Sequence, residues 1–468
     1  MIELVGVSFR YGPQGSKVFN DVSIKIGDGE WVEISGGNSS GKTTLCKIMS
    51  GLLRPQTGFV LIDGVESDKA LDDFRTRPPI SMTFQNPDSY FLSSTVRDEL
   101  LFTMKNLSLP EDEMKGRFNE AVELFRLSDC LNRNPHRLSG GEKQRLSLAI
   151  AWSTGAKHLI LDEPLSFLDK KGKDDFLNTL KAAFEGRGTS IIWITLFTGE
   201  FRYASRRFIV GNGSVTEVDA KENDNNIVRP INELGKKHSL KVSVYPSGTR
   251  EVLEVFEAVF GYDESSFAIE VDELRIKQGE FVLVTGLNGS GKTTFLLGAS
   301  GLLKPIRGTV KIMCRHINSK KDFPHGQVGF IFQAPEDTFF KPTVFEEVAF
   351  GLMSTDKNTK VEKAVSNALL LVGLDPGKYL SKNPYSLSQS EKRLVAIAST
   401  ILIDPDIYFF DEPFIFLDVD AMERVLDLLI DLNGRGKTVI VATHSDELLK
   451  ELASRSIHCV DGRCVLGG

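Results

Sequence analysis

The feature that most constrains this chain is a glycine-rich string that occurs twice. Residues 36–43 fit the pattern G-x-x-x-x-G-K-[ST], and residues 286–293 fit it again, 250 positions later. Glycine makes up about 7% of ordinary sequences, so a single chance match is expected in roughly a few per cent of chains this long. Two matches in corresponding places therefore indicate a duplicated domain rather than chance.

Each string predicts a loop that binds phosphate groups. Successive backbone N–H groups of such a turn point at the phosphates, and the start of a following helix adds a favourable dipole. Lys42 and Lys292 would neutralise phosphate charge, while the hydroxyl groups of Thr43 and Thr293 would ligate Mg²⁺. The groups expected around the phosphates are Gly36, Asn38, Gly41, Lys42, Thr43 and Thr44 in the first loop, and Gly286, Asn288, Gly289, Gly291, Lys292, Thr293 and Thr294 in the second.

The flanking sequence has the context that a phosphate loop needs. Residues 31–34 and 281–284 are apolar runs typical of β-strands that lead into each loop. Residues 44–50 and 294–300 are expected to form the helices that lead out. The alternative is a glycine turn without a ligand.

Composition narrows the possible partners. The 468 residues carry a net charge of −7 with no dense basic stripe, so direct nucleic-acid binding is not expected. Five cysteines are scattered without C-x-x-C pairing, which predicts free thiols in a reducing compartment and no metal–thiolate site. We find no signal peptide and no apolar run approaching the ~18 residues of a membrane span, so a membrane role would require a partner.

Other landmarks repeat at almost the same spacing as the loops. We therefore predict two domains, at residues 1–218 and 242–468, joined by a polar linker at 219–241. A flexible linker of that length spans roughly 25 Å, which permits the two halves to pair within one chain. The matching positions are Lys42 with Lys292, Gln85 with Gln333, Leu138 with Leu387, and Asp162 with Asp411.

A pair of carboxylates ends an apolar run in each half. Asp162 and Glu163 follow the run at residues 158–161, and Asp411 and Glu412 follow the corresponding run in the second half. A buried strand delivers such residues to its carboxyl end. Asp162 and Asp411 suit Mg²⁺, normally through water, while Glu163 and Glu412 are placed to polarise an attacking water.

Between loop and carboxylates, residues 138–145 read Leu-Ser-Gly-Gly-Glu-Lys-Gln-Arg, which resembles the LSGGQ signature of the ABC (ATP-binding cassette) ATPases. The resemblance covers essentially the whole chain. It implies an α/β fold of two tandem P-loop cassettes that bind ATP. Each would have a mainly parallel sheet, an antiparallel β portion, and a helical insertion near residues 87–138 or 335–387. It also implies that the signature of one cassette caps the nucleotide held by the other.

The resemblance assigns roles to further residues. Tyr11 and Tyr262 would stack on adenine. Gln85 and Gln333 would be Q-loop glutamines that also approach Mg²⁺, and His444 would be a switch histidine that contacts the γ-phosphate. The catalytic set is therefore Glu412, His444, Gln333, Glu163 and Gln85, and the signature contacts are Ser139, Gly140, Gly141 and Ser388.

The two halves depart from the family pattern in different places. Leu196 aligns with His444, and Gln389 and Ser390 replace the two glycines of the second signature. In the crossed arrangement both departures fall in site one, formed by the first loop and the second signature. Site two, formed by the second loop and the first signature, has no such departure, so we predict slow turnover or held ATP at site one and hydrolysis at site two. Retained Glu163 leaves hydrolysis at site one open.

The segments after the two Q-loops, residues 86–91 and 334–340, look like those of energy-coupling factor (ECF) or cobalt-type ATPases. These power bacterial and archaeal importers of vitamins and metal ions. The likeness implies a peripheral protein on the cytoplasmic face of the membrane, with transmembrane and substrate-binding membrane subunits as partners. Asp88, Glu336 and Asp337 could then pair with arginines of a transmembrane subunit.

Three other interpretations stay open. One is a soluble double-cassette ATPase that acts on ribosomes or other assemblies, although no long charged linker or cysteine-rich iron–sulfur segment is visible. Another is a fused sugar-importer ATPase, whose second phosphate loop is usually degraded, whereas residues 286–294 are intact. The third is an ATP-bound scaffold without activity, which would require site two to be silent despite Glu412 and His444.

Overall fold

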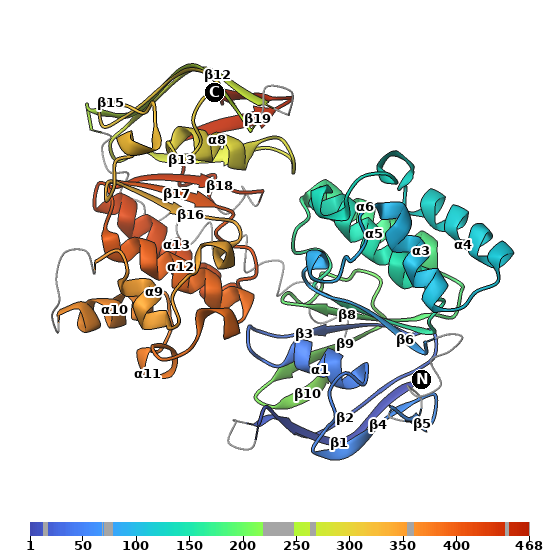
Figure 1. The fold of residues 1–468 in the computed structure, drawn as a ribbon. Helices are drawn as coiled ribbons and strands as arrows, with labels where there is room; N and C mark the ends of the chain where they lie inside the picture. The colour runs from blue at the N-terminus through green and yellow to red at the C-terminus, as the bar shows by residue number, and fades with distance from the viewer. Residues whose placement is uncertain are drawn as a thin grey trace. The chain divides into compact units, whose positions relative to one another are not determined.

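The computed structural model describes residues 1–12, 17–67, 69, 78–218, 248–262, 268–352, 360–444 and 449–467. The chain divides into two units, Met1–Arg229 and Pro230–Gly468, called cassette 1 and cassette 2 below. They run from blue to green and from yellow to red in Figure 1. The predicted linker at 219–241 lies outside the described residues.

Cassette 1 begins with an antiparallel sheet of strand order β2-β1-β4-β5. Its apolar residues alternate with polar ones, so one face is buried and the other meets solvent. The strands are β1 (Ile2–Arg10), β2 (Lys17–Ile26), β4 (Thr57–Ile62) and β5 (Val65–Glu66).

A second sheet, of order β10-β9-β3-β8-β7-β6, forms the centre of cassette 1. All neighbours are parallel except β10 against β9. Its inner strands β7 and β8 are buried along their whole length, as expected for a parallel sheet covered on both faces. The strands are β3 (Trp31–Ser35), β6 (Ile80–Thr83), β7 (His158–Asp162), β8 (Ser190–Thr195), β9 (Arg206–Gly211) and β10 (Ser214–Val218).

Helices cover the two faces of this central sheet differently. Helix α1 (Lys42–Met49) shares a core with the antiparallel sheet, and α3 to α6 share another on the opposite face (Figure 1). Ser139 caps α5 in a capping box with Glu142, which fixes where the signature helix starts. The remaining elements are η1 (Pro87–Ser89), α3 (Val96–Asn106), α4 (Glu111–Leu124), η2 (Ser128–Cys130), η3 (Pro135–Arg137), α5 (Gly140–Ser153) and α6 (Lys170–Phe184).

Cassette 2 repeats this architecture in one ten-stranded sheet, of order β15-β14-β11-β12-β20-β19-β13-β18-β17-β16. A parallel contact between β12 and β20 joins its antiparallel part to its central part. The strands are β11 (Glu251–Gly261), β12 (Ala268–Lys277), β13 (Phe281–Thr285), β14 (Arg307–Ile312), β15 (Arg315–His316), β16 (Val328–Ile331), β17 (Ile407–Asp411), β18 (Thr438–Ala442), β19 (Arg455–Val460) and β20 (Arg463–Leu466).

The helices of cassette 2 again lie on both sides of the sheet (Figure 1). Helix α8 packs against β11 and the central strands, while α9, α10 and α12 pack together. The predicted α/β fold is confirmed for each half of the chain. The elements are α8 (Lys292–Ala299), η4 (Lys320–Asp322), η5 (Pro335–Thr338), α9 (Val344–Ala349), α10 (Lys360–Leu371), α11 (Pro376–Tyr379), η6 (Pro384–Ser386), α12 (Gln389–Ile403) and α13 (Val419–Gly434).

The prediction of five free thiols is wrong for two of them. Cys459 and Cys464 face each other across the β19–β20 hairpin and form a disulfide. The two-residue turn is Asp461-Gly462, with positive φ at both positions, as type I′ hairpins require. A search for C-x-x-C spacing misses this pair because the hairpin, and not the local spacing, brings the sulfurs together.

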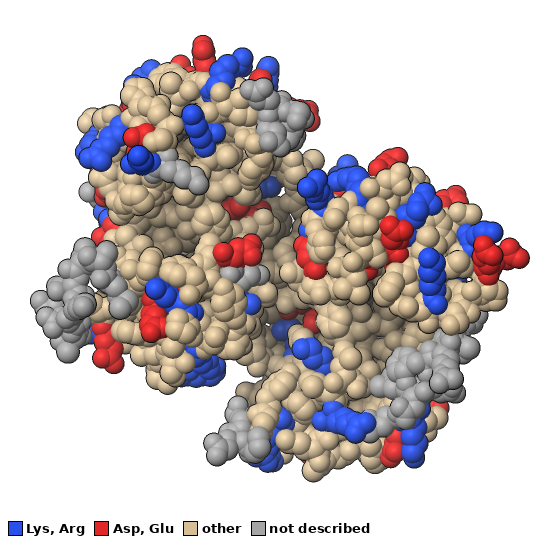
Figure 2. Space-filling model, in the orientation of Figure 1, with Lys and Arg blue, Asp and Glu red and all other residues tan. Residues whose placement is uncertain are grey.

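Two broader expectations can be compared with the structure. None of the described helices is long and apolar enough to cross a bilayer. On the described part of the face drawn in Figure 2, basic and acidic side chains are interspersed without a continuous basic stripe. That the chain does not bind nucleic acid directly stays a prediction.

Candidate functional site

The phosphate loop of each cassette connects a central strand to a buried helix. A Cβ atom at Gly36 would lie 2.4 Å from the carbonyl oxygen of Val210, and one at Gly286 would lie 2.4 Å from that of Cys459. No side chain fits at either position, so these glycines are required by close backbone approach. The last glycine of each loop also has positive φ, +106° at Gly41 in cassette 1.

The loop lysines are buried and turned back onto their own loops. Lys42 Nζ donates to the carbonyl oxygens of Gly36 (2.8 Å) and Gly37 (3.0 Å). Lys292 Nζ donates to those of Gly286 (2.9 Å) and Leu287 (3.2 Å). Each loop is therefore lined by a buried cation in the place where the sequence predicts phosphate.

The predicted magnesium ligands lie together in each cassette. Thr293 Oγ1 donates to Asp411 Oδ2 (2.7 Å), and Thr43 likewise bonds Asp162. Among the described residues, Oδ1 of Asp162 and Oδ1 of Asp411 are buried and have no hydrogen-bond partner. Burial raises the pKa of both carboxyl groups to about 6. A bound Mg²⁺, directly or through water, would satisfy these oxygens, so the donor set fits the ion.

The two glutamates have different neighbours. In cassette 2, the backbone N–H of His444 donates to Glu412 Oε1 (3.0 Å), and His444 Nδ1 lies 2.9 Å from Oε2. In cassette 1, Gln85 Nε2 donates to Glu163 Oε2 (2.7 Å). Burial, together with the charge of the preceding aspartate, raises the pKa of Glu163 to about 7. Glu412 is thus held by the predicted switch histidine of its own cassette, whereas Glu163 is held by the predicted Q-loop glutamine.

The arrangement described so far matches a known family. A family model described as "ABC transporter" matches residues 19–166 and 270–415. The chain belongs to the ABC transporter family. It is an ATPase with two cassettes, and ATP with Mg²⁺ is the ligand of this family.

Relatives of similar length support the assignment. Two are named "Putative ABC transporter ATP-binding protein". One, from Methanosarcina mazei, is 29% identical over 99% of this chain and 94% of its own length. The other, from Bacillus cereus, is 28% identical over 99% and 90%. A solved structure, "Model of ribosome-bound archaeal Pelota and ABCE1", matches with a TM-score of 0.69 and 24% identity over 99% of this chain and 78% of that one. At that identity it shows the fold alone.

The switch position of the first ABC cassette follows β8. The sheet registers place Ile194 and Ala442 opposite equivalent residues, Ile34 and Val284. Counting two residues on from each puts Leu196 where the second cassette has His444. Leucine offers no hydrogen-bond donor to phosphate, so cassette 1 lacks this contact within its own chain segment.

The two signatures begin helices in the same way. Ser139 caps α5, and Ser388 caps α12 in a capping box with Glu391. The replacement of Gly140 and Gly141 by Gln389 and Ser390 therefore leaves the helix start intact. Side chains are added at the first turn, where the family brings backbone close to phosphate. That each signature caps the nucleotide of the other ABC cassette stays a prediction.

The remaining predicted residues lie around the loops. Tyr11 and Tyr262 are exposed, as a stacking platform must be, and the hydroxyl of Tyr11 lies 3.0 Å from Thr44 Oγ1. Gln333 is exposed and accepts a hydrogen bond from Arg393 through its backbone carbonyl. Three others lie in the loop turns, namely Asn38, Asn288 and Gly289.

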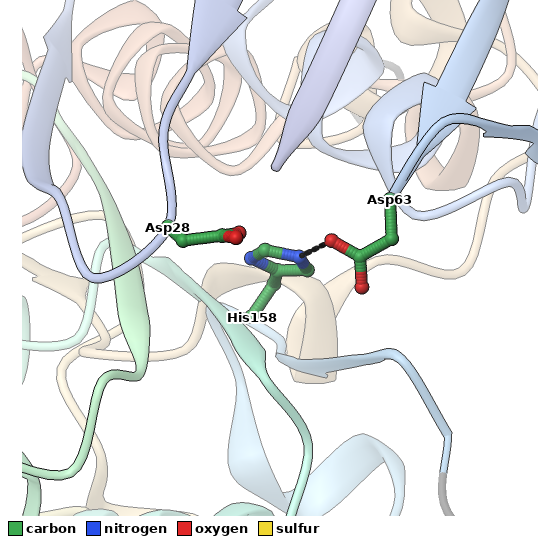
Figure 3. A group of neighbouring side chains, drawn as sticks. All are labelled: Asp28, Asp63 and His158. Atoms are coloured by element: carbon green, nitrogen blue, oxygen red, sulfur yellow. Dashed lines mark hydrogen bonds and ion pairs between the residues drawn. The ribbon is translucent and has the colours of Figure 1, made fainter.

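Sequence analysis missed a polar cluster on cassette 1, formed by Asp28, Asp63 and His158 (Figure 3). Lys157 Nζ donates to Asp28 (3.0 Å) and Asp63 (2.9 Å), and the amino group of Met1 donates to both carboxylates. Burial favours the neutral form of Asp63, but these hydrogen bonds outweigh it and hold its pKa well below the usual range. Two ammonium groups already occupy the carboxylates, so the cluster ties the antiparallel sheet to β7 and does not fit a metal.

Proposed function

We propose that this chain is the ATP-hydrolysing subunit of an ECF-type membrane importer for a vitamin or a metal ion. It would act as a peripheral protein on the cytoplasmic face of the membrane. Its partners would be transmembrane and substrate-binding subunits. The single observation that carries the proposal is an exposed apolar turn, built in the same way on each cassette, directly after the Q-loop.

A buried glutamate holds this turn in both cassettes. In cassette 1, Glu99 Oε2 accepts the backbone N–H groups of Leu92 (3.0 Å) and Ser93 (2.6 Å). In cassette 2, Glu347 Oε2 accepts those of Phe340 (3.0 Å) and Lys341 (2.8 Å). The side chains presented at the turn are largely exposed, 76% for Leu92 and 56% for Phe340.

The turn of cassette 2 is part of a larger aromatic patch. The rings of Phe340 and Phe350 are 4.6 Å apart, and Lys341 Nζ lies over both. Tyr385 is exposed nearby and donates to the carbonyl of Phe339. Fixed, exposed aromatic side chains are typical of a surface that a partner covers. A helix at the cytoplasmic end of a transmembrane subunit would supply the apolar face that fits it.

One predicted contact with that partner needs revision. Asp88 was expected to pair with arginines of a transmembrane subunit. Instead it accepts from Lys143 Nζ (2.6 Å) and lies 3.1 Å from His136 Nδ1, both within cassette 1. The carboxylate thus links the Q-loop segment to the signature helix. Asp337 is exposed, and the side chain of Glu336 lies outside the described residues.

In this proposal the two sites differ in their ability to hydrolyse ATP. Bound Mg²⁺ would neutralise phosphate charge beside Asp162 or Asp411. Glu412, oriented by His444, would take the proton of the attacking water at site two. At site one, Glu163 is held by Gln85, burial raises its pKa, and the side chain of Leu196 donates no hydrogen bond. Site two would therefore hydrolyse ATP, while site one would hold it.

Purification from detergent-solubilised membranes of the source organism tests the partner. We expect integral membrane proteins to co-purify with the tagged full chain and to be lost in Phe340→Asp. The matched control is Leu370→Asp on α10, because Leu370 is equally exposed (58%). Recovery of ribosomal proteins in place of membrane proteins, unaffected by Phe340→Asp, would refute the importer and favour the ribosome-acting class.

A further inference from the structure

The loop after β8 in cassette 1, residues 196–201 and here called the switch loop, is anchored by a buried carboxylate on β3. The backbone N–H of Gly199 donates to Glu33 Oε1 (2.7 Å), and that of Phe201 donates to Glu33 Oε2 (2.7 Å). Glu33 is completely buried. Both carboxylate oxygens are therefore used to hold the switch loop against the sheet.

An ion pair supports this anchor from the other side. Arg207 on β9 is registered directly opposite Glu33, with Nε 3.7 Å from Oε1. Burial raises the pKa of Glu33 to about 7, with a smaller contribution from Glu200, while the two N–H donors and the Arg207 guanidinium act in the opposite direction and favour the charged carboxylate. A buried acid in a central strand is costly unless it is paired in this way, so the group is a built feature of cassette 1.

Further contacts fix the rest of the switch loop. Thr198 Oγ1 lies 2.5 Å from Ser35 Oγ, at the end of β3. Glu200 Oε2 accepts from Thr195 Oγ1 (2.5 Å). The ring of Phe201 stacks on that of Trp193, 4.6 Å away. Four consecutive residues of the switch loop, from 198 to 201, are thus each tied to the sheet or to the start of the loop.

Cassette 2 has different residues at the positions that make this anchor. The parallel registers of β3 and β13 equate Glu33 with Leu283, and those of β9 and β19 equate Arg207 with Ser456. Both members of the ion pair are therefore replaced together. The buried carboxylate thus occurs in cassette 1, which has Leu196 at the switch position, and is replaced by leucine in cassette 2, which has His444 there.

We infer that Glu33 is a positioning residue that fixes the switch loop of cassette 1, so that this cassette retains its nucleotide while cassette 2 turns over. The part of this inference that concerns nucleotide rests on the unequal sites proposed above. The family resemblance implies that the residue at the switch position contacts the γ-phosphate, and such a contact has to form and break when nucleotide is exchanged. A loop held at four successive residues keeps Leu196 in one place.

Hydrogen exchange on the full chain tests the anchoring. The variant Glu33→Leu/Arg207→Ser copies the pair of cassette 2, and Glu33→Gln keeps the volume but loses one acceptor. We expect amides 199 and 201 to exchange at least tenfold faster in the double variant, with an intermediate effect in Glu33→Gln. Exchange in β6 and β7 should be unchanged, which shows that the cassette is folded. Unchanged exchange at 199 and 201 in both variants would overturn the inference.

Release of radiolabelled nucleotide, measured by a chase after loading with MgATP, tests the consequence. We expect a slow phase of about one nucleotide per chain, which Lys42→Ala abolishes and Lys292→Ala keeps. Release in this phase should accelerate at least tenfold in the double variant. Faster exchange without faster release would overturn the role of Glu33 in retention. No slow phase in the unmodified chain would refute the unequal sites themselves, while leaving the result on loop anchoring readable.

Discussion

The unequal pair of glutamates gives the sharpest test of how this protein uses ATP. We expect Glu412→Gln to reduce steady-state ATPase activity at least 100-fold, because a positioned general base contributes about 10² to 10⁴ in rate. Glutamine has nearly the same size and still accepts the backbone N–H of His444, which is 3.0 Å from Glu412 in the parent chain. The variant therefore removes the base and leaves the loop in place.

The same change in cassette 1 should be almost silent. Site one has Leu196 in place of a donor, and loss of one transition-state contact costs about 10² to 10³. Its share of turnover is then about one part in a hundred or less, so Glu163→Gln should change the total rate by less than about twofold.

Phosphate release by the purified full chain at saturating MgATP measures both variants side by side. The control is nucleotide binding, which should survive in each. An equal loss of activity in Glu412→Gln and Glu163→Gln would refute the assignment of turnover to site two. A larger loss in Glu163→Gln would reverse it.

Three further predictions concern stability. Burial raises the pKa of Glu33 from 4.5 to about 7, so the folded state holds this proton more tightly than the unfolded state. Glu33 alone should therefore lower the free energy of unfolding in urea by up to about 3 kcal/mol as pH rises from 4.5 to 7. Glu33→Leu should reduce the slope to the part contributed by Asp162, Glu163 and Asp411, whose pKa values are also raised. Gly298→Ala would place its Cβ 2.2 Å from an aromatic ring and should lower the free energy of unfolding by about 1–3 kcal/mol. Gly116→Ala lies in open space on α4 and should raise the free energy of unfolding by about 0.5–1 kcal/mol. Thermal melts of the two variants distinguish these effects. Reductant should break the disulfide between Cys459 and Cys464 and destabilise cassette 2 by about 2 kcal/mol. A variant with valine at both positions copies the pair at the same place in cassette 1 and should not respond to reductant. Equal responses of the parent chain and this variant would contradict the prediction.

Much of the fold could be predicted because its signals are local. The strand expected at 31–34 is β3, and the helix expected at 44–50 begins two residues earlier, at Lys42. Each depends on residues within one short window, where apolar periodicity and glycine spacing are informative. The errors lie at the boundaries of these elements: β3 ends one residue later than expected, and the helix begins two residues earlier and ends one residue earlier.

The parts that the sequence did not reveal depend on contacts between distant residues. Glu33 lies in a run expected to be a buried strand, but its partners Gly199, Phe201 and Arg207 are more than 160 positions away. A charged residue inside such a run was the available signal, since a buried carboxylate requires partners.

The pattern of divergence between the cassettes follows from what each part of the site can tolerate. The phosphate loops stay alike because backbone carbonyls 2.4 Å from the Cβ position of Gly36 and Gly286 exclude any side chain. The surroundings of the glutamate have no such limit: a ring nitrogen of His444 can hold Glu412, and an amide of Gln85 can hold Glu163. Binding chemistry is therefore kept in both halves, while turnover can be lost in one. An exchange of Leu196 for histidine alone should not restore activity to cassette 1, because Glu33 would still hold the loop that carries it.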